Sequence, residues 1–409
     1  MSTSRAVDRL RSSLDRIARR HPSMPPPQVL VVAPGLELES GGSQPFHAAS
    51  VGKVMTATLV AMLVEQGRLG FDTPVGKVLP GSDLDGLPAA PGVDVGADVT
   101  VEHLLTHTSG LPDLFEPSGV RETTYSIEVT AGQPDRRWTP TTLLDEVRDH
   151  AAVGRPGERF CYGDPGFVLL GRVVEEVTGG RFNDVLRERV LAPAGMERSS
   201  TPYTDARAPE DLAGLDVAPF WISDHELSRA LSMSLDWAGG GVVAPPSDLV
   251  AFQRALHGGR LVYPATLAWM SRPRHRLRRG IHYGAGTVTV RFGEFTPPFL
   301  RWAARTRRRP RALRDASVLL PAAGRPRGAQ LPRLPADEPV VHDARAHRAC
   351  PRRALTALRR SGPSSTGRRA ALGARPARSS PTRPARHCSR RSSRSSADGP
   401  SHAGSRGRR

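Results

Sequence analysis

The sequence predicts an α+β fold in which a small antiparallel sheet and a group of helices surround one long apolar helix. Residues 29–33 and 36–39 form two short strand-like runs around a Pro-Gly turn, which indicates a β-hairpin. Residues 50–66 are apolar on nearly every face, as is typical of a helix at the centre of a domain. Further helical patterns follow at 141–150, 166–178, 181–191 and 247–257. We therefore expect a sheet accompanied by a helical subdomain.

The first 27 residues predict an amphipathic helix and a linker. Val7, Leu10, Leu14 and Ile17 are spaced as one stripe of a helix, and three prolines follow at 25–27. This segment lacks the apolar centre of a signal peptide, and no apolar run in the chain reaches membrane-spanning length. From these features we expect a cytoplasmic protein without a membrane partner.

A serine and a lysine at the start of the long apolar helix are the candidate reactive pair. The chain contains 56 arginines but only two lysines, and Lys53 lies three residues after Ser50. Residues three apart share a helix face, so the hydroxyl and the amine can meet. A desolvated lysine has a depressed pKa and can act as a base, which arginine cannot do. The pattern predicts a nucleophile activated by an amine inside a dry pocket, although a capping serine beside a core lysine would look the same.

Four motifs occur in an order that is similar to one family of enzymes. They are SVGK at 50–53, HLLTHTSGLP at 103–112, Tyr-Gly-Asp at 162–164 and GGGVVAPPSDL at 239–249. Over about residues 28–295 the chain resembles the serine β-lactamase and penicillin-binding-protein superfamily, in the branch that holds class C β-lactamases, D-aminopeptidases and related esterases. The resemblance implies a β-lactamase-like antiparallel sheet flanked by helices.

The resemblance also implies a chemistry. Ser50 would form an acyl-enzyme while Lys53 and Tyr162 move the protons, and the nearby ammonium would lower the pKa of Tyr162. Asp164 stands where the family has asparagine. Its carboxylate would hold the lysine but favour the charged amine, so its role is open. The implied substrates are esters, D-amino-acid amides or peptides, and β-lactams. We favour an esterase or peptidase, because the expected location makes antibiotic defence less natural, and no metal or organic cofactor is implied.

Other candidate residues carry weaker signals. His103 and His107 are four residues apart, but no third metal ligand is evident, so we expect them to cap and pack the loop that ends at Gly110. His47 precedes Ser50 by three residues, a spacing that rarely gives a productive Ser-His pair. The Gly-x-Ser-x-Gly elbow of α/β-hydrolases is missing from the sequence. Cys161 is expected to be a core thiol.

The last part of the chain differs sharply in composition. Residues 301–409 contain 28 arginines, no lysine and five acidic residues, a net charge of +23, whereas residues 1–300 have a net charge of −5. The sequence pI of about 11.2 therefore reflects this tail. We predict three segments: residues 1–27, a hydrolase domain over residues 28–299, and a disordered low-complexity tail over residues 300–409.

The tail begins at the point in the sequence where the resemblance implies the last strands of the domain's sheet. The third motif of the family, a Lys/His-Ser/Thr-Gly strand, does not follow residue 286. A shifted reading frame in a GC-rich gene explains this best, because such codons yield arginine, proline, alanine and serine. A natural disordered extension and a nucleic-acid-binding arm are the alternatives, and the arm is disfavoured because Trp302 is its only aromatic group. Without those strands we expect an unpaired hairpin edge and a pocket at Ser50 that lacks one wall. The rival functions are a catalytically defective scaffold or a polybasic arm on an inactive domain.

Overall fold

The computed structural model describes residues 3–22, 25–114, 127–222 and 225–295. Its helices are α1 (Thr3–Arg20), α2 (Gly52–Glu65), α3 (Gly81–Leu84), α4 (Val95–Asp98), α5 (Val101–Leu105), α6 (Ile127–Gly132), α7 (Pro140–Arg148), α8 (Pro165–Thr178), α9 (Phe182–Leu186), α10 (Ala192–Ala194), α11 (Pro202–Asp205), α12 (Trp237–Gly240), α13 (Pro246–His257), α14 (Pro264–Met270) and α15 (Phe292–Phe295). Its strands are β1 (Val29–Ala33), β2 (Leu36–Ser40), β3 (Phe46–His47), β4 (Trp221–Ile222), β5 (His225–Glu226), β6 (Val243–Ala244), β7 (His275–Arg278), β8 (Ile281–Tyr283) and β9 (Val288–Val290). The mixture of helices and antiparallel strands confirms the predicted fold class.

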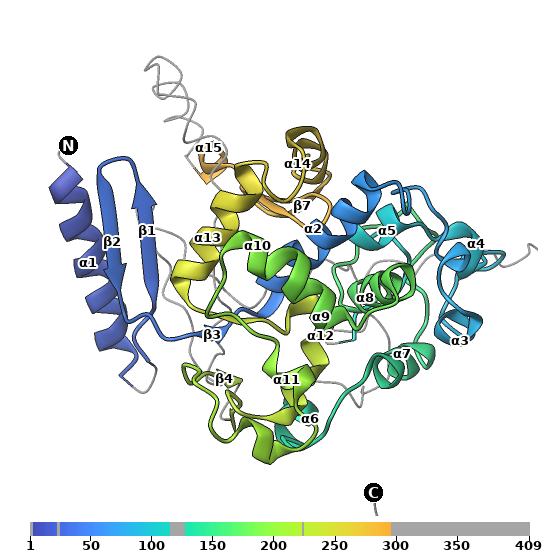
Figure 1. The fold of residues 1–409 in the computed structure, drawn as a ribbon, viewed down its shortest axis with the longest axis horizontal. Helices are drawn as coiled ribbons and strands as arrows, with labels where there is room; N and C mark the ends of the chain where they lie inside the picture. The colour runs from blue at the N-terminus through green and yellow to red at the C-terminus, as the bar shows by residue number, and fades with distance from the viewer. Residues whose placement is uncertain (1–2, 23–24, 115–126, 223–224, 296–409) are drawn as a thin grey trace, which may run out of the picture. The chain divides into compact units, whose positions relative to one another are not determined.

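The predicted hairpin is present as β1 and β2. The strands pair antiparallel, with Val31 opposite Leu38, and the turn residue Gly35 has a φ of 69°, which only glycine adopts without strain. Leu38 is buried while its neighbours in β2 are more exposed, as the alternating sequence predicts. Helix α1 lies alongside β2 (Figure 1), so the predicted N-terminal amphipathic helix is confirmed.

The strands of the described residues form four small antiparallel sheets. These are β1–β2, β3–β6, β4–β5 and β7–β8–β9. Among the described residues β1 pairs only with β2, so the other edge of β1 has no backbone partner there, as expected. The predicted tail and the site of the expected missing strands, from residue 296 onward, lie outside the described residues.

Helix α2 occupies the centre of the helical layer. A 3₁₀ turn over Ala49–Val51 leads into it, and eleven of its residues are buried. Helices α8, α9 and α12 pack against α2 (Figure 1), and α5 packs on α8. The sequence predicted this helix from residue 50, and the structure differs only in the tighter first turn. Because α2 is surrounded by other elements, any polar side chain on it must find a partner inside the protein.

The other predicted helices are found as α7, α8, α13 and a broken fourth helix. The pattern over 181–191 suggested one helix, but α9 ends at Leu186 and a π-helical turn continues over Arg187–Leu191. This turn buries both Val190 and Leu191 in the main apolar core. Among the described helices, none combines the length and the apolar character that crossing a bilayer requires.

Candidate active site

The candidate nucleophile and the candidate base lie next to each other at the start of α2. The Nζ atom of Lys53 donates a hydrogen bond to Oγ of Ser50 over 3.4 Å, which is the one-turn contact predicted from their spacing. Only 2% of Lys53 is accessible, whereas Ser50 is exposed. The amine therefore lies in the dry interior, but the prediction of a dry pocket around the serine is wrong for the described residues. Exposure leaves the hydroxyl open to a substrate.

Lys53 is held by two further acceptors from distant parts of the chain. Its Nζ atom forms a short ion pair with Oδ1 of Asp164, at the start of α8, and donates to the backbone oxygen of Gly239 over 2.9 Å. Asp164 is itself 7% exposed. With Ser50, these contacts satisfy the three N–H groups of the ammonium. These contacts orient the amine toward the serine. They also answer part of the open question about Asp164, because its carboxylate binds the ammonium of Lys53.

The charge state of Lys53 differs from the expectation. Burial alone would lower its pKa, as the sequence suggested. The negative charge of Asp164, with smaller contributions from Tyr162 and Asp236 and the hydrogen bond that Lys53 donates to Asp164, outweighs that penalty and raises the pKa above the ordinary value of 10.5. The resting amine is therefore a charged ammonium at neutral pH.

Tyr162 also differs from the expectation of a lowered pKa. Burial raises the pKa of its phenol above 10.0, and the negative charge of Asp164 acts in the same direction. The ammonium of Lys53 and hydrogen bonds with Ser50 and Lys53 act against this shift without reversing it. These hydrogen bonds bring Tyr162, Ser50 and Lys53 into one cluster. At neutral pH the phenol is protonated and can donate a proton.

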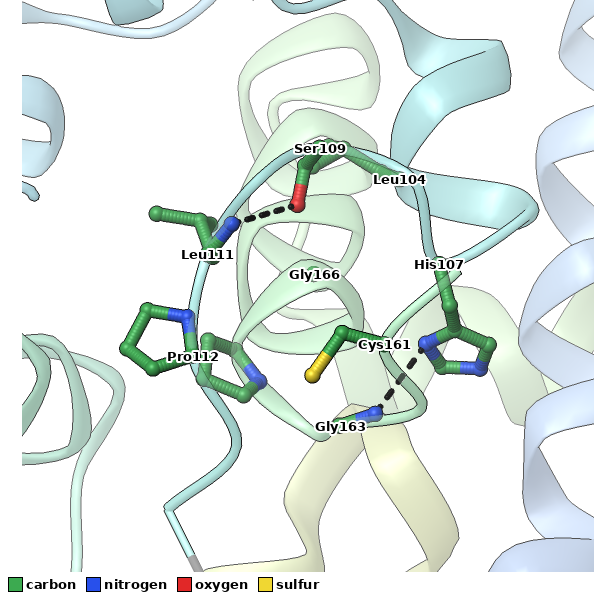
Figure 2. Close-up of a pocket in the computed structure, with 9 residues that line it drawn as sticks. Leu104, His107, Ser109, Leu111, Pro112, Cys161, Gly163 and Gly166 are labelled. Carbon is green, nitrogen blue, oxygen red and sulfur yellow. Dashed lines mark hydrogen bonds between the residues drawn. The ribbon is translucent and has the colours of Figure 1, made fainter. Parts of the chain in front are cut away.

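The segment that carries Tyr162 borders a small internal cavity. Cys161 and Gly163 line it together with His107, and Figure 2 shows His107 facing the backbone nitrogen of Gly163. The cavity measures about 10 Å³, which is room for roughly one water molecule. Cys161 is half-buried, so it is less enclosed than the core thiol that the sequence predicted. The cavity is too small for an organic substrate, so it belongs to the support of Tyr162.

Glycines of the motif at 239–249, together with Gly52, let the backbone approach the reactive pair. A Cβ atom on Gly240 would lie 2.6 Å from the backbone oxygen of Ala49, and one on Gly239 would lie 2.8 Å from Oδ1 of Asp164. A Cβ atom on Gly52 would lie 2.8 Å from Cα of Gly240. Both sides of this contact must therefore lack a side chain. The sequence marked residues 239–249 as a motif, but it gave no sign that Gly239 supplies an acceptor to Lys53.

A contact between a histidine and an aspartate that the sequence did not predict lies beside the cluster. Nε2 of His47, on β3, lies 3.1 Å from Oδ2 of Asp236, and the imidazole stacks on Phe220. Burial disfavours the charged carboxylate, but the hydrogen bond and charge of His47, with the charge of Lys53, lower the pKa of Asp236. His47 thus contacts an acid rather than Ser50. Asp236 could not have been found from spacing, since it lies in no motif.

The two motif histidines have the structural contacts expected of them. His103 completes a capping box with Thr100 at the start of α5. His107 is 4% exposed and packs among aromatic rings, including those of Tyr162 and Tyr283. Each histidine therefore takes part in capping or packing near the loop that ends at Gly110.

Comparisons with known proteins show which sequences this chain is similar to. The family model described as Beta-lactamase matches residues 40–290. Penicillin-binding protein 4 of Amycolatopsis lactamdurans is 32% identical over 238 residues, which cover 55% of this chain and 56% of that protein. Lovastatin esterase of Penicillium rubens is 28% identical over 258 residues, which cover 56% of this chain and 61% of that protein. This chain thus spans little more than half the length of either relative.

Solved structures extend the comparison to the fold. The crystal structure of a D-stereospecific amidohydrolase from Streptomyces sp. superposes with a TM-score of 0.52 and 26% sequence identity. The match covers 63% of this chain and 75% of the amidohydrolase. The similarity therefore extends over more than half of this chain.

Proposed function

The chain belongs to the β-lactamase family, and on that premise we propose that it hydrolyses a carboxylic ester or amide through an acyl-enzyme on Ser50. The observation that carries the proposal is the contact between the exposed Ser50 hydroxyl and the buried Lys53 amine, 3.4 Å apart. A buried lysine whose ammonium points at an accessible hydroxyl is an arrangement that suits nucleophilic catalysis.

The proposed reaction has two halves. Oγ of Ser50 attacks the carbonyl carbon while its proton passes to the Lys53–Tyr162 pair, and the phenol of Tyr162 protonates the leaving alcohol or amine. Water then attacks the acyl carbon, and its proton passes through the same Lys53–Tyr162 pair to Oγ of Ser50. The carboxylic acid is released and the free serine is restored. Because Lys53 rests as an ammonium, the first transfer requires that it deliver a proton to a neighbour, for which Asp164 is in contact.

The names of the relatives support a range of acyl substrates. A D-stereospecific amidohydrolase acts on amides, and an esterase acts on esters. Amides and esters both contain a carbonyl carbon that a serine hydroxyl can attack. In the proposed cluster, Ser50 supplies that hydroxyl. We propose esters and D-amino-acid amides or short peptides as the substrate class, with β-lactams as the alternative suggested by the penicillin-binding relative.

Covalent labelling of the full chain tests the proposal directly. A fluorophosphonate probe should attach to one serine, and peptide mapping by mass spectrometry should place the adduct on Ser50. Tyr162 and Lys53 contact that serine, so an adduct there reports the reactive cluster. An adduct on a different serine, or no adduct with a properly folded chain, contradicts the proposed function.

Replacing Asp164 with asparagine should move the alkaline rise of the acylation rate to lower pH. The carboxylate raises the pKa values of both Lys53 and Tyr162, so its loss lowers both. In the wild type, the pKa of Lys53 is higher in the folded chain than its unfolded value of 10.5. The stability that the charged amine contributes is therefore complete below pH 10.5 and is lost as the pH rises through the folded pKa. The neutral amine should therefore appear earlier in Asp164→Asn. Acylation rates measured between neutral and alkaline pH check this; an unmoved or upward-shifted profile contradicts it.

The domain boundaries drawn from the sequence remain part of this proposal. We propose that residues 28–299 carry the hydrolase and that residues 300–409 contribute no catalytic group. Reading the gene beyond codon 295 in the other two frames tests the frameshift explanation. A frame that encodes a Lys/His-Ser/Thr-Gly strand would support it, and two frames without such a strand would count against it.

A further inference from the structure

Two non-glycine residues among those described have a φ in the left-handed region, and each adjoins a proposed reactive side chain. Ala49, with φ of 47°, precedes Ser50, and His107, with φ of 55°, contacts the segment around Tyr162. Such a backbone conformation is strained for a residue with a side chain and persists only where surrounding contacts impose it. The contacts of His107 show what imposes the strain there.

His107 holds the chain on both sides of Tyr162. Its backbone oxygen accepts a hydrogen bond from the nitrogen of Cys161 over 2.9 Å. Its Nδ1 atom accepts one from the nitrogen of Gly163 over 3.4 Å, which is the dashed line to Gly163 in Figure 2. The imidazole also lies against the phenol ring, with 4.4 Å between the ring centroids. One residue thus fixes the peptide groups before and after Tyr162 and one face of its ring.

The hydrogen bonds identify the tautomer of His107. Because Nδ1 accepts from a backbone N–H, it carries no hydrogen, and the ring proton must lie on Nε2. Nε2 then donates to the hydroxyl of Tyr283 on β8 over 2.9 Å. Burial raises the pKa of Tyr283 well above 10.0, so its hydroxyl stays protonated. The imidazole is therefore anchored at one nitrogen and free to use the other as an acceptor for the Tyr162 segment.

We propose that His107 is a positioning residue for Tyr162, and that the Nδ1 acceptor is the part of it that matters. This inference rests on the proposed function of Tyr162. His107 does not touch Ser50 or the substrate in this role; it sets the direction of the phenol toward Ser50 and Lys53. A misplacement of about 1 Å in a reacting group can lower a rate by about 10²-fold.

Two amide variants separate positioning from simple packing. Asparagine places a carbonyl oxygen close to the position of Nδ1 and tolerates positive φ better than most residues, but it cannot reach Tyr283. Glutamine reaches toward the position of Nε2, fills more of the space and can donate to Tyr283, but offers no acceptor to Gly163. If His107 only fills space, the His107→Gln variant should keep the higher reaction rate. If His107 positions Tyr162 through Nδ1, the His107→Asn variant should keep the higher rate.

The first measurement is the rate at which the fluorophosphonate probe phosphonylates Ser50 in the full chain, forming the Ser50 Oγ–P bond as fluoride leaves. We expect His107→Gln to lower this rate by about 10²-fold and His107→Asn to stay within about tenfold of the wild type. Melting temperatures of both variants, taken in parallel, identify any loss that is due to unfolding. If glutamine preserves the rate better than asparagine, or if both variants react as the wild type does, the positioning role is wrong.

The second measurement does not depend on activity. The chain contains five tyrosines, so incorporation of 3-fluorotyrosine gives five ¹⁹F NMR signals, and the signal lost in Tyr162→Phe belongs to Tyr162. We expect that signal to move or broaden in His107→Gln and to change little in His107→Asn. Equal changes in the two variants overturn the inference. A wild type that reacts with no probe contradicts the proposed function, while this spectrum still decides the role of His107.

Discussion

Substitution of Ser50 by alanine should lower the hydrolysis of a p-nitrophenyl ester by about 10⁶-fold, which is the scale on which loss of a serine nucleophile acts. The hydroxyl is exposed and its hydrogen bonds are with Lys53, over 3.4 Å, and with Tyr162, so its removal should change the free energy of unfolding by about 1 kcal/mol or less. Initial hydrolysis rates and a denaturant titration measure the two effects. A large loss of rate with almost unchanged stability is the expected signature of the nucleophile.

Ser43 provides a matched control for that experiment. It is also exposed, it lies seven positions before Ser50, and its contact with Arg198 uses the backbone oxygen. Ser43→Ala should therefore hydrolyse the ester as the wild type does. If Ser50→Ala retains more than a tenth of the wild-type rate, another group carries the reaction and the proposed nucleophile is wrong.

Substitution of Lys53 by methionine should remove activity and stability together. The change leaves the carboxylate of Asp164 buried without its cation, which destabilises a protein by about 3–5 kcal/mol. It also removes the amine next to Ser50, so we expect the ester hydrolysis rate to fall by at least about 10⁴-fold. Denaturant unfolding and initial rates, measured on the same preparation, give both numbers.

The double variant Lys53→Met, Asp164→Asn separates the two effects. Without a buried carboxylate, most of the lost stability should return, because both charges of the pair have been removed. Activity should not return, since the amine is still missing. A double variant as unstable as Lys53→Met alone would show that the ion pair is not the source of the destabilisation. A stable and active double variant would exclude Lys53 from the chemistry.

The elements that the sequence predicted well are those governed by local pattern. The hairpin of β1 and β2 follows from alternation around a Pro-Gly turn, and α2 follows from an apolar run that ends at Gly67. The contact between Ser50 and Lys53 also follows from helical spacing alone. In each case the interacting residues are close in sequence, so the repeat of the helix or strand determines which of them meet.

The features that the sequence did not predict depend on residues brought together from far apart. The pKa of Lys53 is raised because Asp164 and Asp236 lie near it, and neither distance can be derived from spacing along the chain. The same holds for Gly239, which supplies an acceptor from a segment 186 positions away. Burial was predicted correctly for Lys53, but its effect on charge depends on these distant partners.

The scarcity and placement of lysine have a practical consequence for handling the protein. The chain has two lysine side chains, Lys53 and Lys77. Lys77 is exposed, whereas Lys53 is buried and its resting form at neutral pH is the ammonium. Of the two lysines, amine-reactive dyes or resins should therefore modify Lys77 and leave the reactive cluster unmodified.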